Sequence, residues 1–169
     1  ASIISRRVYE VMETAADTLG AFSHGYTYSG HPLGAAAAMA TLDIVEQEDL
    51  PGNALRTGDH FQSKLKEAFA DHPLVGEVRG VGLLGAVEFV ADRERKERFD
   101  PSLKVGGRVS AAALQEGLIA RAMPHGDILG FSPPLVITAA EVDEMIARGR
   151  RALDKVTDDL VREGKWKAA

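Results

Sequence analysis

The hydrophobic pattern of the sequence changes its period near residue 72, and this change limits the possible folds more than any other feature. Upstream, apolar residues recur at helical spacing over 33–48, which is dense in alanine, and over 54–70. The apolar face of the second stretch is expected to hold Leu55, Phe61, Leu65 and Phe69. Downstream, LVGEVRGVGLLGAVEFV (74–90) is rich in β-branched residues and glycine, which predicts two strands joined by a turn at Gly80-Val81-Gly82. The chain therefore has a mixed α/β fold class.

The N-terminal segment continues this pattern. Residues 2–4 can form the end of a strand, and Ser5 is a good N-cap for a helix that stops near Gly20. The helix over 33–48 is expected to be buried, because its small side chains allow another backbone to approach closely. Pro51-Gly52-Asn53 is expected to end it.

The C-terminal half alternates in the same way. A helix is predicted over 107–116 with Gly117 as its stop, then short strands within 118–123 and within 123–138. Thr138 and Glu141 have the spacing of a capping box at the start of a last helix. The apolar face of that helix is expected to contain Val142, Met145, Ile146, Leu153, Val156 and Leu160. The final residues, GKWKAA, are expected to fray.

Composition excludes several classes of protein. A chain of 169 residues that is 45% hydrophobic can bury its own core, and its length suggests one domain or slightly more. With 20 basic against 25 acidic residues and no basic stripe, a nucleic-acid interface is not expected. The charged run 91–100 mixes both signs and is expected to be a solvated surface. There is no cysteine, and the sequence shows neither a signal peptide nor a membrane-spanning run, so we expect a cytoplasmic protein.

The segment HGYTYSGHP (24–32) precedes the alanine-dense helix and has no hydrophobic period. Backbone amides at the start of a helix attract anions, and Gly25 and Gly30 allow an anion to come close. Thr27 and Ser29 can donate hydroxyl hydrogen bonds to phosphate oxygens, and the two tyrosines can flank a flat ring. The alternative is a surface loop that only caps its own helix. A metal site on the two histidines is not expected, because no third ligand lies at a suitable spacing.

Arg121 ends a predicted strand just ahead of the turn Pro124-His125-Gly126-Asp127. There its planar guanidinium can receive a carboxylate. The alternative is an exposed arginine paired with a surface acid. His125 could act as a base or be merely solvated, and Asp127 has the character of a turn residue. GVGLLG (80–85) is not expected to bind a dinucleotide, since no helix follows it.

Four segments occur in an order that resembles one enzyme family. They are HGYTYSGHP with its alanine-rich helix, GEVRGVGLLGAVEFV, GLIARA, and GDILGFSPPLVIT ahead of the terminal helix. From about Ile3 to Leu160 they resemble the C-terminal part of a class III pyridoxal-phosphate-dependent aminotransferase, and SGHP resembles the ω-amino acid:pyruvate branch. The resemblance implies the α/β fold of fold type I transferases. Residues 1–50 would be the C-terminal remnant of the large domain, and 51–169 the small domain, with a short, mainly antiparallel sheet covered by helices on one side.

The resemblance also implies roles for individual residues. Thr27, through its hydroxyl, and Tyr26, through its backbone amide, would bind the phosphate of pyridoxal 5'-phosphate in the neighbouring subunit of a homodimer with composite sites. Arg121 would receive the substrate carboxylate. The segment from Arg121 to Pro133 is about two residues longer than in several family members, which puts the reach of the arginine in question.

The family's catalytic lysine, its ring-stacking aromatic residue and the aspartate that pairs with the pyridine nitrogen have no counterpart in this sequence. No catalytic residue is therefore expected here, and the chain alone should be inactive in transferring an amino group from an amine or ω-amino acid to a keto acid such as pyruvate. Two other hypotheses stay open: a non-catalytic module that completes a site on a partner chain, and an autonomous anion-binding domain.

Overall fold

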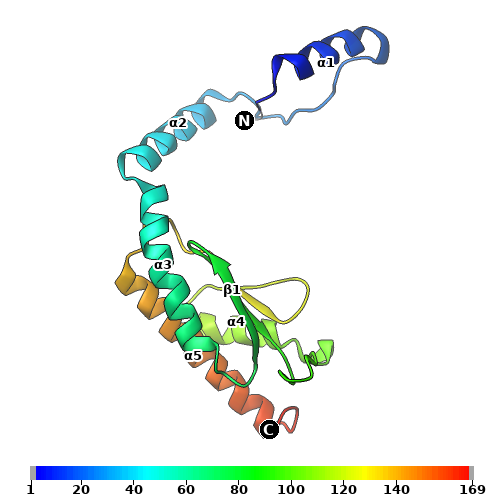
Figure 1. Ribbon diagram of the computed structural model, residues 1–169. Helices are drawn as coiled ribbons and strands as arrows, with labels where there is room; N and C mark the ends of the chain where they lie inside the picture. The colour runs from blue at the N-terminus through cyan, green and yellow to red at the C-terminus, as the bar shows by residue number, and fades with distance from the viewer. Residues whose placement is uncertain (1–2, 168–169) are drawn as a thin grey trace. The chain divides into compact units, whose positions relative to one another are not determined.

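The computed structural model describes residues 3–167, which form two compact units, one up to Asp43 and one from Ile44 on. Figure 1 shows the order of the elements along the chain. The helices are α1 (Arg6–Leu19), α2 (Pro32–Gln47), α3 (Leu50–Phe69), the short 3-10 helix η1 (Pro101–Leu103), α4 (Val105–Gln115) and α5 (Ala139–Arg162). The strands are β1 (Val75–Val81), β2 (Leu84–Phe89), β3 (Arg121–Ala122) and β4 (Ile128–Phe131). Among the residues described, no helix combines the length and apolar character needed to cross a membrane.

The first unit consists of α1, the segment after it and most of α2. Ser5 caps α1 as predicted, accepting a hydrogen bond from the Val8 amide, and Gly20 ends the helix at φ 85°. Of the strand predicted over 2–4, Ser2 lies outside the described residues, and residues 3 and 4 form no strand. The helix predicted over 33–48 is confirmed as α2, but neither α1 nor α2 contains a buried residue within this chain.

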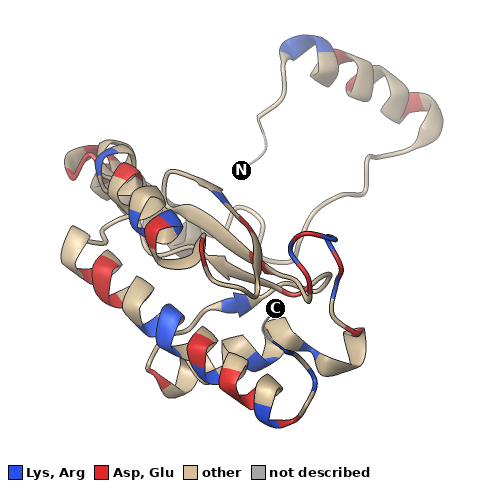
Figure 2. Cartoon of the chain, turned by 60° about the horizontal axis from the view of Figure 1, so that its bottom comes forward, with Lys and Arg blue, Asp and Glu red and all other residues tan. Residues whose placement is uncertain are grey.

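The second unit is built on a four-stranded sheet in the order β1-β2-β4-β3, with every neighbouring pair antiparallel. Along β4, buried Leu129 and Phe131 alternate with the less buried Ile128 and Gly130. Phe131 packs edge-on against Phe61 of α3, with ring centroids 6.3 Å apart. Helices therefore cover one face of the sheet, while the other is open within this unit, as the sequence predicts. Figure 2 shows charges of both signs along the helices.

The start of α3 differs from the prediction. Asp49 caps the helix through a hydrogen bond from the Gly52 amide at 3.2 Å, so Pro51 and Gly52 lie in the first turn instead of ending a helix. Proline is tolerated there because the amide that it lacks has no helical partner. Leu55 is 71% exposed, so its predicted place on the apolar face is wrong, whereas Phe61 is fully buried.

The turn between β1 and β2 is shorter than predicted and brings the hairpin against α3. Gly80 and Val81 belong to β1, and Gly82 takes the positive φ of the turn, 54°. The side-chain amide of Gln62 donates, through Nε2, to the carbonyl oxygens of Gly82 and Leu84 at 2.8 and 2.9 Å. These bonds fix the β1–β2 turn on α3.

Gly58→Ala should destabilise the second unit by about 1–3 kcal/mol, because the new methyl group would overpack this contact. A Cβ atom at Gly58 would lie 2.7 Å from the Cα of Gly82, and the backbone there cannot move aside freely. The matched control is Gly107→Ala in α4, where the nearest atom would be 3.9 Å away. We expect the control to be neutral or slightly stabilising in urea unfolding; equal losses in both variants would contradict the close-approach explanation.

The last helix has the predicted ends, but the tail does not behave as expected. The side chain of Thr138 accepts from the Glu141 amide and the Glu141 carboxylate accepts from the Thr138 amide, which confirms the capping box. Trp166 is buried, and its Nε1 donates to the Ala91 carbonyl oxygen at 2.8 Å, so the prediction of fraying is wrong at this residue. An indole gains enough from burial to hold the chain beyond the helix.

His72 is a buried polar residue at the junction of α3 and α5. Its Nδ1 accepts a hydrogen bond from the Leu74 amide, and its Nε2 lies 3.4 Å from the Asp154 carboxylate. Asp154 also pairs with Arg150, which in turn donates to the Ala68 carbonyl oxygen. Burial lowers the pKa of His72 and the charge of Arg150 lowers it further, against an opposing effect of Asp154.

The free energy of unfolding is therefore expected to fall as the pH drops below about 6.5, the ordinary pKa of imidazole. Because the pKa of His72 is lower in the folded state, the unfolded chain takes up the proton first, and stability decreases down to the folded pKa. Above 6.5 the contribution is fully present. Urea unfolding of the chain across this range should give a steeper pH dependence than that of His72→Gln. His125→Gln, which removes an exposed imidazole without a hydrogen-bond partner in residues 3–167, is the control, and identical slopes for wild type and His72→Gln would refute the assignment.

Candidate functional site

Arg121 lies on the edge strand β3, in a row of residues that crosses the whole sheet. Arg79 of β1 pairs with Ala86 of β2, Ala86 pairs with Gly130 of β4, and Gly130 pairs with Arg121. Residues in one such row point to the same face, and Gly130 and Ala86 belong to the open one. Three strand spacings put the Cα atoms of the two arginines about 14 Å apart. An arginine therefore lies at each end of this row. The two residues between them, Ala86 and Gly130, are small and form a floor without polar side chains.

A cavity of about 520 Å³ lies against this face of the sheet. Its lining includes Arg79, Ala86, Arg121, Met123, His125 and Ser132. A volume in this range suits a small organic ligand. The floor is apolar, and the polar groups are at the margins, which is the usual arrangement of a site that orients a ligand through a few polar contacts.

The two arginines differ in their charge partners. Arg79 contacts the carboxylates of Glu77 and Glu88 at 2.6 and 2.7 Å, and the hydrogen bond with Glu88 is the main reason that its pKa is raised. Within residues 3–167, Arg121 forms no ion pair and its side chain no hydrogen bond. The alternative expectation, an exposed arginine paired with a surface acid, is therefore not what the structure shows. Of the two arginines, Arg121 is the one available to an incoming carboxylate.

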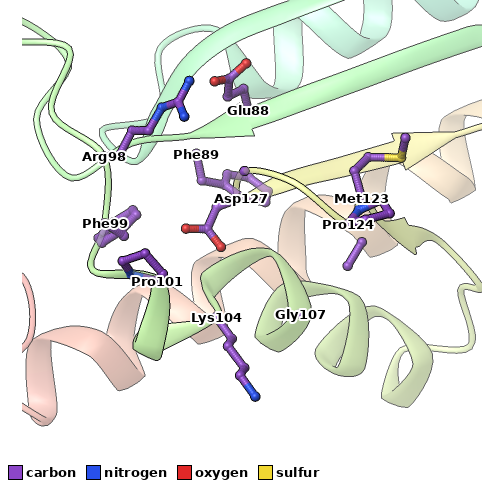
Figure 3. A pocket seen from close by; sticks show the side chains of 12 residues that line it. Glu88, Phe89, Arg98, Phe99, Pro101, Lys104, Gly107, Met123, Pro124 and Asp127 are labelled. Carbon is purple, nitrogen blue, oxygen red and sulfur yellow. The ribbon is translucent and has the colours of Figure 1, made fainter.

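A second cavity, of about 470 Å³, also borders the turn between β3 and β4 (Figure 3). Met123 and Pro124 line both, His125 lines only the first, and Asp127 lines only the second. Asp127 accepts a hydrogen bond from the Gly106 amide at 2.8 Å, where Lys104 supplies no side-chain cap for α4. The sequence indicates a turn residue here but not this contact, because the residue capped lies 21 positions away.

The segment 24–32 lies in the first unit, whereas Arg121 lies in the second. The Ser29 amide donates to the Tyr26 carbonyl oxygen at 2.8 Å, closing a turn that exposes Thr27. The Tyr26 amide donates to Ser29 Oγ at 3.0 Å. That amide, predicted to bind phosphate, is engaged within the loop and would have to exchange its partner.

The loop otherwise fits a phosphate group. In the described part of the chain, neither the hydroxyl nor the amide of Thr27 takes part in a hydrogen bond, and the same holds for the amides of Leu33 and Gly34 in the first turn of α2. Unpaired amides at the start of a helix favour an anion, as does a hydroxyl donor beside them. The imidazoles of His24 and His31 pack edge-on against Tyr26 and Tyr28, with centroids 5.7 and 5.8 Å apart.

Comparison with known proteins identifies the family. The family model described as "Aminotransferase class-III" matches residues 1–153. The chain belongs to the class III aminotransferases. The predicted family and the fold class of this aminotransferase chain are thereby confirmed.

Relatives of this aminotransferase chain include an uncharacterized aminotransferase of Sinorhizobium fredii, 68% identical over 98% of the chain and 35% of the relative. A diaminobutyrate–2-oxoglutarate transaminase of Halomonas elongata is 58% identical over 99% of the chain and 36% of the relative. The omega transaminase of Pseudomonas jessenii in complex with PMP has a TM-score of 0.84 and 40% identity, over 94% of this chain and 34% of that one. The chain therefore spans about a third of the length of these proteins.

Proposed function

We propose that this chain forms part of a pyridoxal-phosphate-dependent transaminase that moves an amino group from an amine or ω-amino acid to a keto acid. The observation that carries the proposal is the unpaired Arg121 at the edge of a ligand-sized cavity on the open sheet face. Family membership supplies the type of reaction. The geometry supplies a receptor for a carboxylate, which amino acids and keto acids share and simple amines lack.

The residues of the first unit would hold the cofactor. The Thr27 hydroxyl would donate to a phosphate oxygen, with the start of α2 favouring the negative charge and the Tyr26 amide joining after exchange of its Ser29 contact. When bound, pyridoxal phosphate supplies the electron sink for breaking a bond at the amine carbon. Arg121 would hold the substrate carboxylate and so fix the orientation of that carbon. We place the catalytic lysine in a part of the full-length protein outside this chain, which by itself would be inactive.

The acceptor is proposed to be a small keto acid, and two candidates have support. The resemblance of SGHP to the ω-amino acid:pyruvate branch favours pyruvate. The relative named for diaminobutyrate and 2-oxoglutarate, at 58% identity, favours 2-oxoglutarate. Initial rates of the full-length protein with each acceptor, at a fixed amine, would separate them.

We further propose a cytoplasmic homodimer in which each loop 24–32 serves the site of the other subunit. The exposed side chains of the first unit support an interface. In α2, three large apolar side chains are exposed: Leu33 is 75% exposed, Met39 59% and Leu42 60%. Apolar surface of this kind is normally covered by another protein surface, which the rest of the full-length chain or a second subunit would supply.

The remaining alternatives differ in what they predict for purified material. A full-length protein with transaminase activity and an inactive 169-residue chain would support the proposal. Copurification with a separate lysine-bearing chain would favour the non-catalytic module instead. Binding of phosphate and pyridoxal phosphate by the chain, with no transaminase activity in the full-length protein, would favour the autonomous anion-binding domain.

A further inference from the structure

His125 is the second polar group on the Arg121 side of the cavity. It comes from the β3–β4 turn, whereas Arg121 comes from β3 itself, so the two line the same cavity from one hairpin. In the described part of the chain, the imidazole of His125 has no hydrogen bond or ion pair. Its donor capacity is therefore available to a ligand, as is that of Arg121.

The turn that carries His125 is anchored on both sides. The Met123 amide donates to the Ile128 carbonyl oxygen at 2.9 Å, which closes the hairpin below the turn. Asp127 is held twice, by the Phe89 amide on its carbonyl oxygen at 2.7 Å and by the Gly106 amide on its side chain. Pro124 restricts φ, and Gly126 takes a positive φ of 73°. These constraints direct Asp127 to one cavity and His125 to the other.

The charges around the cavity leave a particular role for this imidazole. At the far end of the row, Arg79 is already occupied by Glu77 and Glu88. A carboxylate entering the cavity would therefore be drawn to Arg121, whose fork takes one acceptor position on each oxygen and leaves the others free for a further donor. An imidazole N–H on the same side offers a second donor in a different direction, and two donors from different directions fix the orientation of a carboxylate.

We propose that His125 is a specificity-determining residue that donates a second hydrogen bond to the substrate carboxylate received by Arg121. The pair would favour carboxylate-bearing substrates over amines of the same length that lack the carboxylate. This inference rests on the proposed function, because it needs Arg121 to be the receptor.

The test measures the binding of glutarate, an unreactive dicarboxylate, to the cofactor-free full-length protein by titration calorimetry. Removing one donor in an exposed site should weaken binding roughly fivefold in His125→Ala. His125→Gln, which keeps a donor, should lie between this variant and the wild type. Arg121→Ala should lose more, because it removes the charge as well. His60→Ala, which removes a half-buried imidazole that pairs with Asp143 and does not line the cavity, should leave the affinity unchanged.

Two results would overturn different statements. If Arg121→Ala weakens glutarate binding and both His125 variants bind like the wild type, the inference about His125 is wrong and the carboxylate site stands. If Arg121→Ala also binds like the wild type, the carboxylate site of the proposed function is wrong, and the role of His125 falls with it. Because Arg121 and His125 are exposed, thermal unfolding should be the same in their variants as in the wild type, and this confirms that affinities are compared between folded proteins.

Discussion

Arg121→Ala in the full-length protein is expected to raise the KM for carboxylate-bearing substrates by about 10- to 100-fold, the loss that follows when a charge-assisted pair of hydrogen bonds is removed. The reason is the isolation of this cation: it lines the cavity, and in residues 3–167 no acid neutralises it. The KM for an amine without a carboxylate should change little. Steady-state kinetics with 4-aminobutyrate and n-butylamine, which have similar chain lengths, would measure both effects in one series.

The control for Arg121 is Arg95→Ala. Arg95 is 81% exposed in its side chain and does not line the cavity, so its removal changes the net charge equally without touching the site. Arg121→Lys provides a second comparison, because it keeps the charge but loses the planar fork that binds both carboxylate oxygens. Equal increases in KM for the two amines after Arg121→Ala would mean that the arginine supports the fold of the site and does not receive the carboxylate.

Most helix ends were predictable because their signals are local. Ser5 and the Thr138–Glu141 pair act on amides within three residues, so the sequence contains the whole interaction. The start of α3 shows how such a prediction fails. Pro51 and Gly52 break a helix in its interior but are compatible with its first turn, and only the capping contact of Asp49 decides between these positions.

The sequence singled out Arg121 and His125 of the candidate site, but neither the other residues that line the cavity nor their geometry. Arg121 stands out in the sequence as the end of a short strand before a turn. Its lack of an acidic partner depends on which residues the sheet places beside it, and Glu77 and Glu88 pair instead with Arg79, which lies 42 positions earlier in the chain. This arrangement follows from the order and register of four strands, and such pairings depend on non-local packing. The same holds for Trp166, which is buried and donates a hydrogen bond to Ala91, 75 residues away.

Thr27→Ala is expected to weaken cofactor retention by roughly 1.5–3 kcal/mol, the contribution of one hydrogen bond to a charged group. Thr27 is exposed in the turn of residues 26–29 and forms no hydrogen bond within the described residues, so alanine should leave the loop and the dimer intact. Release of the cofactor during dialysis, followed by absorbance, would measure the effect in the full-length protein. Thr41→Ala is the matched control, since the Thr41 hydroxyl donates to the Ala37 carbonyl oxygen within α2.

Mixing Thr27→Ala protein with a full-length variant that lacks the catalytic lysine tests whether the loop serves the other subunit. In a heterodimer with composite sites, one site would carry both lesions and the other none. Random pairing of equal amounts should therefore restore about a quarter of the wild-type number of sites in a two-fold symmetric dimer. The assay is run at a cofactor concentration too low to saturate Thr27→Ala, so that neither parent is appreciably active. If subunit exchange is demonstrated and activity does not return, Thr27 serves the site of its own chain, because each heterodimer site would then keep one lesion.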